Sequence, residues 1–376
     1  TYRRKPTSLM VIPTVAQVFL FASGLLVGVL TTALLTVLVK QIALRWNLVD
    51  KPNQRSLHRD PIPRVGGIAI CGGFIAGLAY FFLLRQIIPG LEWIIDFPDK
   101  WILAGAGLMF LLGLTDDLLN IRPTIKLAFQ ALAAFLVVAA GFRFQIPFLH
   151  FQELGVLNEL LSAAITFLWI IGIINAVNLM DGMDGLAAGM SVIAVGSLTI
   201  ALAFNGYGAD LVLVTAFIGA LIGFLLYNAH PASIFMGDSG SLFLGFILAT
   251  FALPAPGEAI GGLTYLVPIL ALGLPILDTV TAIARRGAQG KGIFTADKDH
   301  IHHRIFAKYG GRQRSAVFAL YAVNAVFGLM AIFVLSSEAF AQVALVLSLT
   351  ALFCLFFLLR LGYIQLKPES RVEEAR

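Results

Sequence analysis

Most of the polar side chains able to do chemistry in this sequence fall in four short segments. Asp116 and Asp117 are adjacent in the first, LTDDLLNIRPTIK. Adjacent carboxylates repel each other, and this repulsion favours a bound divalent cation or a shared proton. The solvated end of a helix would also accommodate the pair. Lys126 is either a lysine that extends to the membrane surface or a cation that faces the aspartates and holds a phosphate.

The second segment, INAVNLMDGMDGLAAG, repeats amide and carboxylate side chains at every third position. On a continuing helix these side chains would lie near one face. Their oxygen atoms suit Mg²⁺, which is bound by few carboxylates together with water and substrate phosphates. A capped turn is the alternative interpretation. The four residues are Asn175, Asn178, Asp181 and Asp184.

The third segment, YNAHPASIFMGDSGSLFLG, contains Asp238 immediately before an apolar stretch. A helix N-cap would account for this aspartate alone. It would not account for the polar and aromatic residues upstream, notably Asn228 and Phe235, so we favour a binding site. The sequence contains neither a P-loop motif nor the glycine motif of dinucleotide-binding folds.

The fourth segment, DKDHIHHRI, holds three of the six histidines, which are His300, His302 and His303. It does not match the HExxH zinc motif, and no cysteine accompanies it. Because Arg304 follows directly and further basic residues lie nearby, the pattern fits an anion site for a diphosphate better than a metal site. A solvated basic loop is the alternative.

The composition excludes a soluble protein and predicts what must position these segments. Of 376 residues, 59% are hydrophobic and only 12% are charged, against roughly 25% in soluble domains. A helix needs about 20 apolar residues to span a bilayer. We therefore expect an all-α polytopic membrane protein with about 11 transmembrane helices, in one catalytic domain over 15–361 between tails at 1–14 and 362–376. The expected spans are 15–44, 66–88, 101–115, 124–141, 157–177, 186–204, 211–229, 240–254, 262–284, 316–335 and 340–361.

Basic residues are distributed unevenly between the two sides of these spans. With the loop after the first span in the cytoplasm, 20 of the 26 Lys and Arg residues lie inside and 6 outside. This asymmetry predicts the N-terminus outside and the C-terminus inside, and it explains the basic charge without nucleic-acid binding. All four polar segments then lie at cytoplasmic helix ends, as an enzyme that joins a water-soluble substrate to a lipid requires. A proton-coupled transporter would instead carry midplane acids and an internal repeat.

The segments, in their order along the chain, resemble those of the polyprenyl-phosphate N-acetylhexosamine-1-phosphate transferases. These membrane enzymes move a phospho-sugar from a UDP-sugar to a polyprenyl phosphate and release UMP. The resemblance covers roughly residues 45–315. The motifs that carry it are DKPNQRSLHRDPIPRVGG, TDDLLNIRP with Lys126, NAVNLMDGMDGLAAG, FMGDSGSLFLG, PILDT and HIHHR. The HIHHR form is similar to the WecA/TagO branch, which uses UDP-N-acetylglucosamine.

The resemblance implies roles for individual residues. It implies Mg²⁺, with Mn²⁺ as an alternative, bound by Asp238 and Asn178. It implies substrates UDP-N-acetylglucosamine and polyprenyl phosphate, a bacterial cytoplasmic membrane and, as one assembly, a homodimer. UDP-MurNAc-pentapeptide and other UDP-N-acetylhexosamines remain alternative donors. The catalytic group is expected to be Asp116, Asp117, Lys126, Asp181, His302 and His303, and the substrate-binding group Asn178, Asp184, Phe235, His300 and Arg304.

Overall fold

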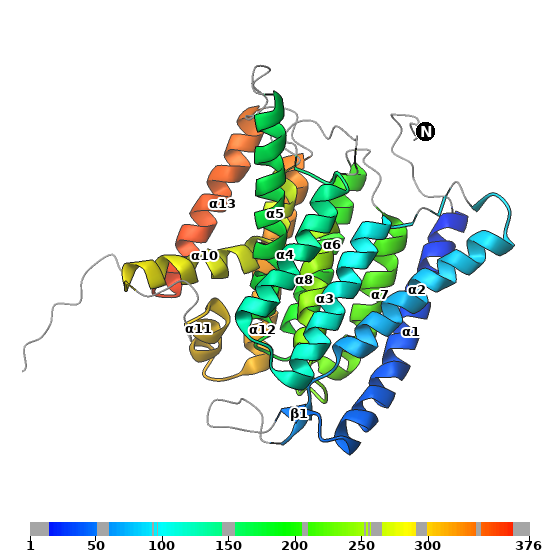
Figure 1. Cartoon of the computed structure of the whole chain (residues 1–376). Helices are drawn as coiled ribbons and strands as arrows, with labels where there is room; N and C mark the ends of the chain where they lie inside the picture. Colours follow the sequence, from blue (N-terminus) through cyan, green and yellow to red (C-terminus); the bar gives the residue numbers. More distant parts are fainter. Residues whose placement is uncertain are drawn as a thin grey trace, which may run out of the picture.

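The computed structural model describes residues 15–50, 60–91, 94–95, 97–144, 155–204, 210–251, 253–254, 256, 265–290, 299–335 and 340–363. These ranges form a bundle of helices with one two-stranded antiparallel sheet (Figure 1). The elements are α1 (Val15–Arg45), β1 (Val49–Asp50), β2 (Ile62–Pro63), α2 (Gly67–Ile87), α3 (Lys100–Leu119), α4 (Pro123–Ala139), α5 (Gly155–Met180), α6 (Leu186–Phe204), α7 (Leu211–Asn228), α8 (Gly237–Phe251), α9 (Leu266–Ala271), α10 (Gly273–Ala288), α11 (Ile301–Lys308), α12 (Gln313–Leu335) and α13 (Phe340–Arg360). The expected tail at 1–14 lies outside the described residues, as does 364–376.

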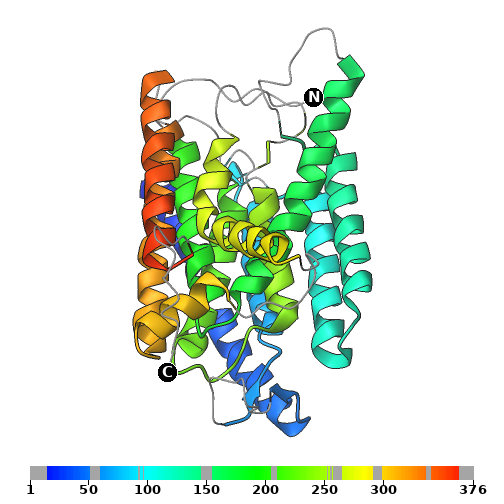
Figure 2. The same cartoon turned by 90° about the vertical axis from the view of Figure 1, so that its left-hand side faces the viewer.

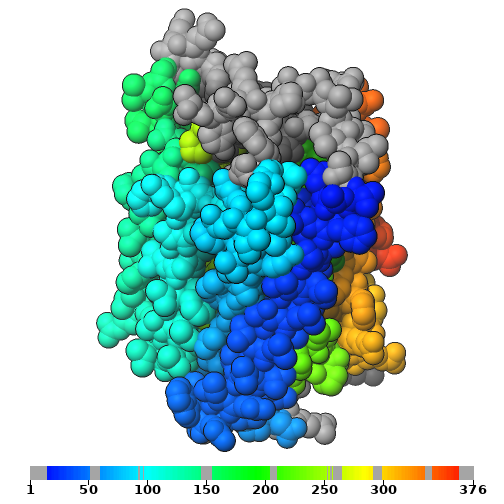
Figure 3. All heavy atoms as spheres, turned by 90° about the vertical axis from the view of Figure 1, so that its right-hand side faces the viewer, coloured from blue at the N-terminus to red at the C-terminus, as the bar shows by residue number. Residues whose placement is uncertain are grey.

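The helices have the lengths and composition of membrane spans. Within the described residues, eight are long and apolar enough to cross a bilayer, namely α1, α2, α3, α5, α6, α7, α12 and α13. Helices α4 and α8 are shorter but also apolar. Helix α1 runs along the outside of the bundle beside α2 (Figure 3), and its outward side chains, such as Phe19 and Leu34, are large and apolar. The chain is thus an all-α polytopic membrane protein.

Helix α8 lies in the centre of the bundle. Every side chain from Ser239 to Thr250 is buried. Phe243 packs edge-on against Phe74 of α2, with ring centroids 5.4 Å apart. Small residues bring other helices close: a Cβ on Gly28 of α1 would lie 3.2 Å from the Cα of Gly219 in α7. Close packing through glycine is typical of membrane helices, where burial of apolar surface gives little driving force.

The expectation of a single span over 262–284 is wrong. The described part of this stretch consists of α9 and α10, separated by a turn at Leu272. Pro275 favours a helix start because its missing N–H is one of the groups that a first turn leaves unbonded. Helix α10 runs crosswise to the bundle (Figures 1 and 2). One face is buried at Leu274 and Asp278, while Val280 and Ile283 are exposed, so its amphipathic pattern suits a membrane surface.

Candidate active site

Three charged side chains from three helices meet at the end of α3. Lys126 of α4 donates through Nζ to Asp116 Oδ2 at 2.7 Å and to Asp238 Oδ2 at 2.6 Å. Asp116 is fixed by a further bond, because its Oδ1 accepts the Ile121 backbone N–H at 2.7 Å. All three side chains keep a minor part of their surface open to solvent. The structure therefore brings Lys126 to Asp116 of the adjacent pair and to Asp238 rather than to Asp117, and its phosphate-binding role stays a prediction.

Asp117 has a different environment from its neighbour. It is buried, and its two carboxylate oxygens accept the backbone N–H groups of Asp238 and Ser239 at 2.8 and 3.0 Å. These groups belong to the first turn of α8, which has no partners for them within the helix. Asp117 therefore caps α8 from α3. No role was predicted from the sequence for Arg64, which binds the Asp117 carbonyl through Nη2 at 2.8 Å.

The second polar segment comes to the same place from the end of α5. Asn178 donates through Nδ2 to Asp238 Oδ1 at 3.2 Å and to the Ser241 hydroxyl at 2.7 Å. Asp181 lies in the turn after α5. Burial, with the charges of Asp238 and Asp117, holds the pKa of Asp181 well above its usual range. Negative charge is thus concentrated around Asp238, with Lys126 as the cation in contact.

Asp184 and Phe235 lie on two loops that are tied together. Asp184 Oδ2 accepts the Ala232 backbone N–H at 3.1 Å and contacts His230 Nδ1 at 2.7 Å. The backbone of Phe235 is held by the end of β2 and the residue before α2: its N–H donates to the Pro63 carbonyl at 2.7 Å, and its carbonyl accepts the Gly66 N–H at 3.0 Å.

Asn228 joins the same two loops from the end of α7. Its Oδ1 accepts the Gly185 N–H at 3.0 Å, and its Nδ2 donates to the Ile234 carbonyl at 2.9 Å. Because Gly185 directly follows Asp184 and Ile234 directly precedes Phe235, these bonds fix two of the residues expected to bind substrate relative to each other.

The histidine segment reaches the site through α11. A Cβ on Gly182 would lie 2.6 Å from His302 Nε2, so this ring lies against the turn that carries Asp181. His302 is buried, and its Nδ1 has no hydrogen-bond partner among the described residues. Burial lowers the pKa of His302 to about 3. At neutral pH this imidazole is therefore uncharged. It does not contribute the positive charge that the predicted anion site would require of it. His303 is exposed beside it.

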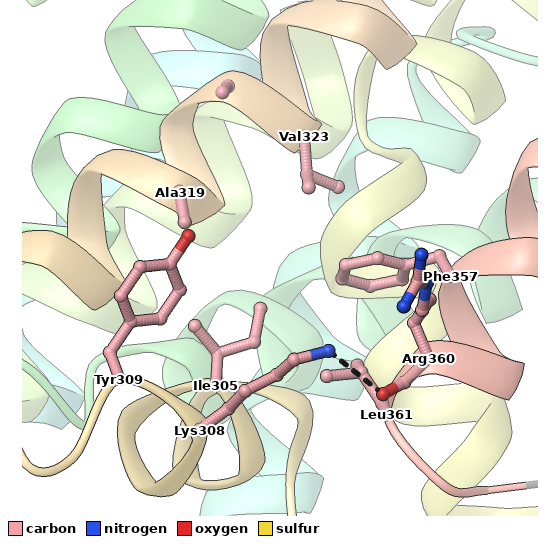
Figure 4. Close-up of a pocket in the computed structure, with 9 residues that line it drawn as sticks. Ile305, Lys308, Tyr309, Ala319, Val323, Phe357, Arg360 and Leu361 are labelled. Carbon is pink, nitrogen blue, oxygen red and sulfur yellow. Dashed lines mark hydrogen bonds between the residues drawn. The ribbon is translucent and has the colours of Figure 1, made fainter.

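Arg304 has partners within the protein. Its guanidinium forms an ion pair with Asp299, donates through Nη1 to the Leu361 carbonyl at 2.9 Å and stacks 3.8 Å from the Tyr363 ring. These contacts tie α11 to the end of α13, and they leave the substrate-binding role of Arg304 a prediction. Helix α11 also lines a cavity of about 330 Å³ with α12 and α13 (Figure 4). There Lys308 Nζ donates to the Arg360 carbonyl at 3.1 Å, which is a second tie between the two helices.

Comparison with known proteins agrees with this arrangement. The glycosyl transferase family 4 model matches residues 101–255, which run from α3 past the end of α8. A probable undecaprenyl-phosphate N-acetylglucosaminyl 1-phosphate transferase of Bacillus subtilis is 37% identical, over 82% of this chain and 83% of the relative. The decaprenyl-phosphate N-acetylglucosaminephosphotransferase of Mycobacterium tuberculosis is 33% identical over 79% and 78%. The undecaprenyl-phosphate alpha-N-acetylglucosaminyl 1-phosphate transferase of Escherichia coli is 30% identical over 78% of each chain. With this identity over four-fifths of its length, the chain belongs to glycosyl transferase family 4.

Proposed function

We propose that this protein transfers N-acetylglucosamine 1-phosphate from UDP-N-acetylglucosamine to a polyprenyl phosphate such as undecaprenyl phosphate, with release of UMP. The relatives named above support this reaction. The observation that carries the proposal is Lys126 Nζ between Asp116 and Asp238. The buried His302 lies against Gly182, which directly follows Asp181. A lysine among several carboxylates can bind phosphate groups. At one end of a membrane bundle, both a phosphorylated lipid and a soluble diphosphate can reach it.

In the reaction, an oxygen of the lipid phosphate attacks the sugar-linked phosphorus of the donor. A new P–O bond forms to the lipid, and the P–O bond to UMP breaks. Catalysis of phosphoryl transfer consists mainly of positioning and charge stabilisation. The lipid phosphate has a second pKa of about 6, so it is largely dianionic at neutral pH and needs little help from a base. Lys126 would hold a phosphate oxygen, and Asp116 would orient Lys126.

The same residues fit Mg²⁺. Asp238, Asn178 and Asp181 offer oxygen ligands. Burial and, after it, the charges of Asp238 and Asp117 raise the pKa of Asp181, and a divalent cation would offset that charge. Among the described residues, no group of three or more His, Cys, Asp or Glu side chains forms a metal site. Mg²⁺ commonly uses one or two carboxylates and takes its other ligands from water and substrate phosphates. Bound there, Mg²⁺ would neutralise charge on the diphosphate, and Mn²⁺ has the same preference for oxygen.

The two tied loops would bind the nucleotide. Asp184 offers a carboxylate for the uracil edge, and Phe235 offers a ring for stacking. His300 and His303 lie on the segment expected to reach the diphosphate and the sugar. An N-acetyl group presents one donor and one acceptor, and a site that pairs both rejects analogues lacking them. Because MurNAc carries the same N-acetyl group, our preference for UDP-N-acetylglucosamine over UDP-MurNAc-pentapeptide rests on the names of the relatives above.

The helix order also supports eleven crossings. Helix α8 begins at the site, and α11 returns to it beside Gly182, so the chain between them must cross back. Helix α9 and the buried first turn of α10 would be part of this crossing, in addition to the eight long helices, α4 and α8, while the rest of α10 lies across the bundle. From the excess of basic residues we infer that the site faces the cytoplasm, in a protein of the bacterial cytoplasmic membrane. A homodimer stays a prediction, which analytical ultracentrifugation in detergent would test.

Cysteine labelling tests this orientation. In a background without Cys71 and Cys354, we expect a cysteine at the exposed Gln289 to react in intact cells only with a membrane-permeant reagent. A cysteine at Glu159, which lies near the opposite end of α5, serves as the control that an impermeant reagent labels. A cysteine at Ser56, which lies outside the described residues, should react like the one at Gln289, only with the permeant reagent. Labelling of Gln289→Cys by the impermeant reagent would show that this residue faces outside and would contradict the proposed orientation.

The reaction itself is tested with purified protein in detergent. UMP release is measured with undecaprenyl phosphate, Mg²⁺ and a panel of UDP-sugars. The proposal expects release with UDP-N-acetylglucosamine, dependence on the lipid, and loss of release with EDTA. Faster turnover of UDP-MurNAc-pentapeptide would contradict the choice of sugar but not the class of reaction. Absence of UMP release with every donor would contradict the reaction.

A further inference from the structure

Asp278 is a buried carboxylate outside the group of residues described above. It belongs to α10, is 1% exposed and faces the start of α11. Its Oδ1 accepts the Ile301 backbone N–H at 2.6 Å, and its Oδ2 contacts His300 Nδ1 at 2.8 Å. Asp278 thus binds both the first N–H group of α11 and the first histidine of the HIHH segment.

The carboxylate determines which nitrogen of His300 carries the proton. An ionised carboxylate only accepts hydrogen bonds, so the contact requires a proton on His300 Nδ1. In the neutral ring the lone pair is then on Nε2, since the bond made by one ring nitrogen sets the state of the other. His300 is itself buried, so it cannot easily exchange this bond for one to water.

The position of His300 bears directly on His302. The two rings are stacked nearly parallel, at 7° with centroids 5.7 Å apart. His302 in turn lies against Gly182, and its buried Nδ1 has no partner in the described residues. A buried ring nitrogen without a partner is costly unless a ligand satisfies it. The Asp278–His300 contact therefore fixes the His300 ring, and the His302 ring stacked on it lies against the turn that carries Asp181.

We propose that Asp278 is a positioning residue for the phosphoryl transfer, which fixes the tautomer and orientation of His300 and, through the start of α11, the placement of His302. The role rests on the proposed function, because the histidines act on the diphosphate only if the protein is a transferase. Partners of this kind behind a functional histidine typically change activity by about 10–100-fold when they are removed.

The geometry makes Asp278→Asn an informative variant. The buried Ile301 N–H still needs an acceptor, so the amide oxygen of the new side chain must take the place of Oδ1. The amide NH₂ group then faces His300 Nδ1 and donates to it. The His300 proton must move to Nε2, so the variant reverses the tautomer while it keeps the cap on α11. Asp278→Ala loses both interactions.

Two controls accompany these variants. Thr281→Val removes a hydroxyl on the same helix whose bonds within the described part of the chain go to carbonyls of α10, at 2.8 Å to Leu277 and 2.9 Å to Asp278. We expect this variant to keep wild-type turnover. Asp278→Asn combined with His300→Gln forms a double-mutant cycle, which detects whether the two residues act through each other.

The first measurement is independent of activity. Ring ¹⁵N shifts are recorded on protein labelled at histidine, with His300 assigned by its loss in His300→Gln. We expect a protonated Nδ1 in the wild type and an unprotonated Nδ1 in Asp278→Asn. The same state in both proteins would overturn the assignment even if the protein proved not to be a transferase.

The second measurement is steady-state kinetics of UMP release. For Asp278→Asn we expect kcat to fall roughly 10–100-fold, with the KM for UDP-N-acetylglucosamine and the melting temperature close to wild type. In the His300→Gln background the same substitution should have little further effect. Unchanged kcat for Asp278→Asn, or effects of the two substitutions that simply multiply, would overturn the positioning role while wild-type activity still supports the proposed function.

Discussion

Asp117 caps the helix that carries Asp238, although 121 residues separate the two in sequence. One Asp117 oxygen lies 2.8 Å from the Asp238 backbone nitrogen, and the other lies 3.0 Å from that of Ser239. The side chain of Asp238 therefore starts from a backbone that α3 holds in place. The two adjacent aspartates of α3 have separate tasks: Asp116 faces Lys126, and Asp117 supports α8.

Replacement of Asp117 should affect stability as well as activity. Asp117→Ala leaves two buried N–H groups unpaired, at a cost of about 1–3 kcal/mol, and lets the first turn of α8 relax. We expect a lower melting temperature and a fall in kcat of roughly 10–100-fold. Asp117→Asn keeps one acceptor, so its melting temperature and its kcat should lie between those of the wild type and those of Asp117→Ala. A fully stable Asp117→Ala that is nonetheless inactive would indicate direct contact with substrate instead.

Glycines 113 and 107 of α3 provide a matched pair for the contact between α3 and α8. A Cβ on Gly113 would lie 2.2 Å from the Asp238 carbonyl oxygen, whereas one on Gly107 would meet nothing within 4 Å. Overpacking of this kind costs about 1–3 kcal/mol. Gly113→Ala should therefore lower both the melting temperature and UMP release, and Gly107→Ala should lower neither. Equal behaviour of the two variants would contradict the packing described here.

Lys126 should be needed for turnover in a way that arginine cannot replace. Lys126→Met removes the cation between Asp116 and Asp238, and loss of such a charge at a reacting phosphate costs roughly 10²–10³-fold in kcat. Lys126→Arg retains the charge, but its planar group cannot place one nitrogen between the two carboxylates. We expect both variants to be folded and poorly active in the UMP assay. Activity of Lys126→Met within a few-fold of wild type would exclude the role.

The buried His302 should make the protein sensitive to acid. Burial lowers its pKa from the ordinary value of 6.5 to about 3, so below pH 6.5 the unfolded chain binds a proton that the folded protein excludes. The contribution of neutral His302 to stability is therefore complete above pH 6.5 and is lost as the pH falls toward 3, by up to about 1.4 kcal/mol per pH unit.

Melting temperatures at pH 7.5 and 5.5 test this effect. His302→Gln should lose less stability than the wild type between the two values, because glutamine does not titrate. The exposed His303 supplies the control, since His303→Gln removes a histidine of the same segment that is less buried. An identical loss in wild type and His302→Gln would show that another group controls the acid response.

The sequence alone predicts the helices well and their contacts poorly. Apolar stretches determine most spans, because the length of a membrane helix follows from bilayer thickness. The break at Leu272 was not predicted, since Pro268, Gly273 and Pro275 stand within a continuous apolar stretch. A residue type also does not reveal its partner. Nothing local shows that Asp117 binds backbone rather than substrate, or that Arg304 pairs with Asp299 and Tyr363.

Two residues without a predicted role, Asp278 and Arg64, also show that the sequence does not reveal a residue's partner. Asp278 is visible in the sequence as a lone carboxylate in an apolar segment, which is an expensive position and hence a signal of function. Its partner could not be named, because His300 is 22 residues away in the sequence and nothing in the sequence links the two. Arg64 gives no such signal, since it is one of several basic residues near the end of a span.

The most direct test of the central claim follows the β-phosphorus of the donor. UDP-N-acetylglucosamine labelled with ³²P at the β position is incubated with the purified protein, undecaprenyl phosphate and Mg²⁺, and the lipid is extracted. Transfer of the phospho-sugar predicts that the label moves into the lipid, that unlabelled UMP appears in equal amount, and that Asp238→Asn abolishes both. Label that remains in soluble UDP while the sugar reaches the lipid, or an Asp238→Asn variant that transfers at the wild-type rate, would contradict the account.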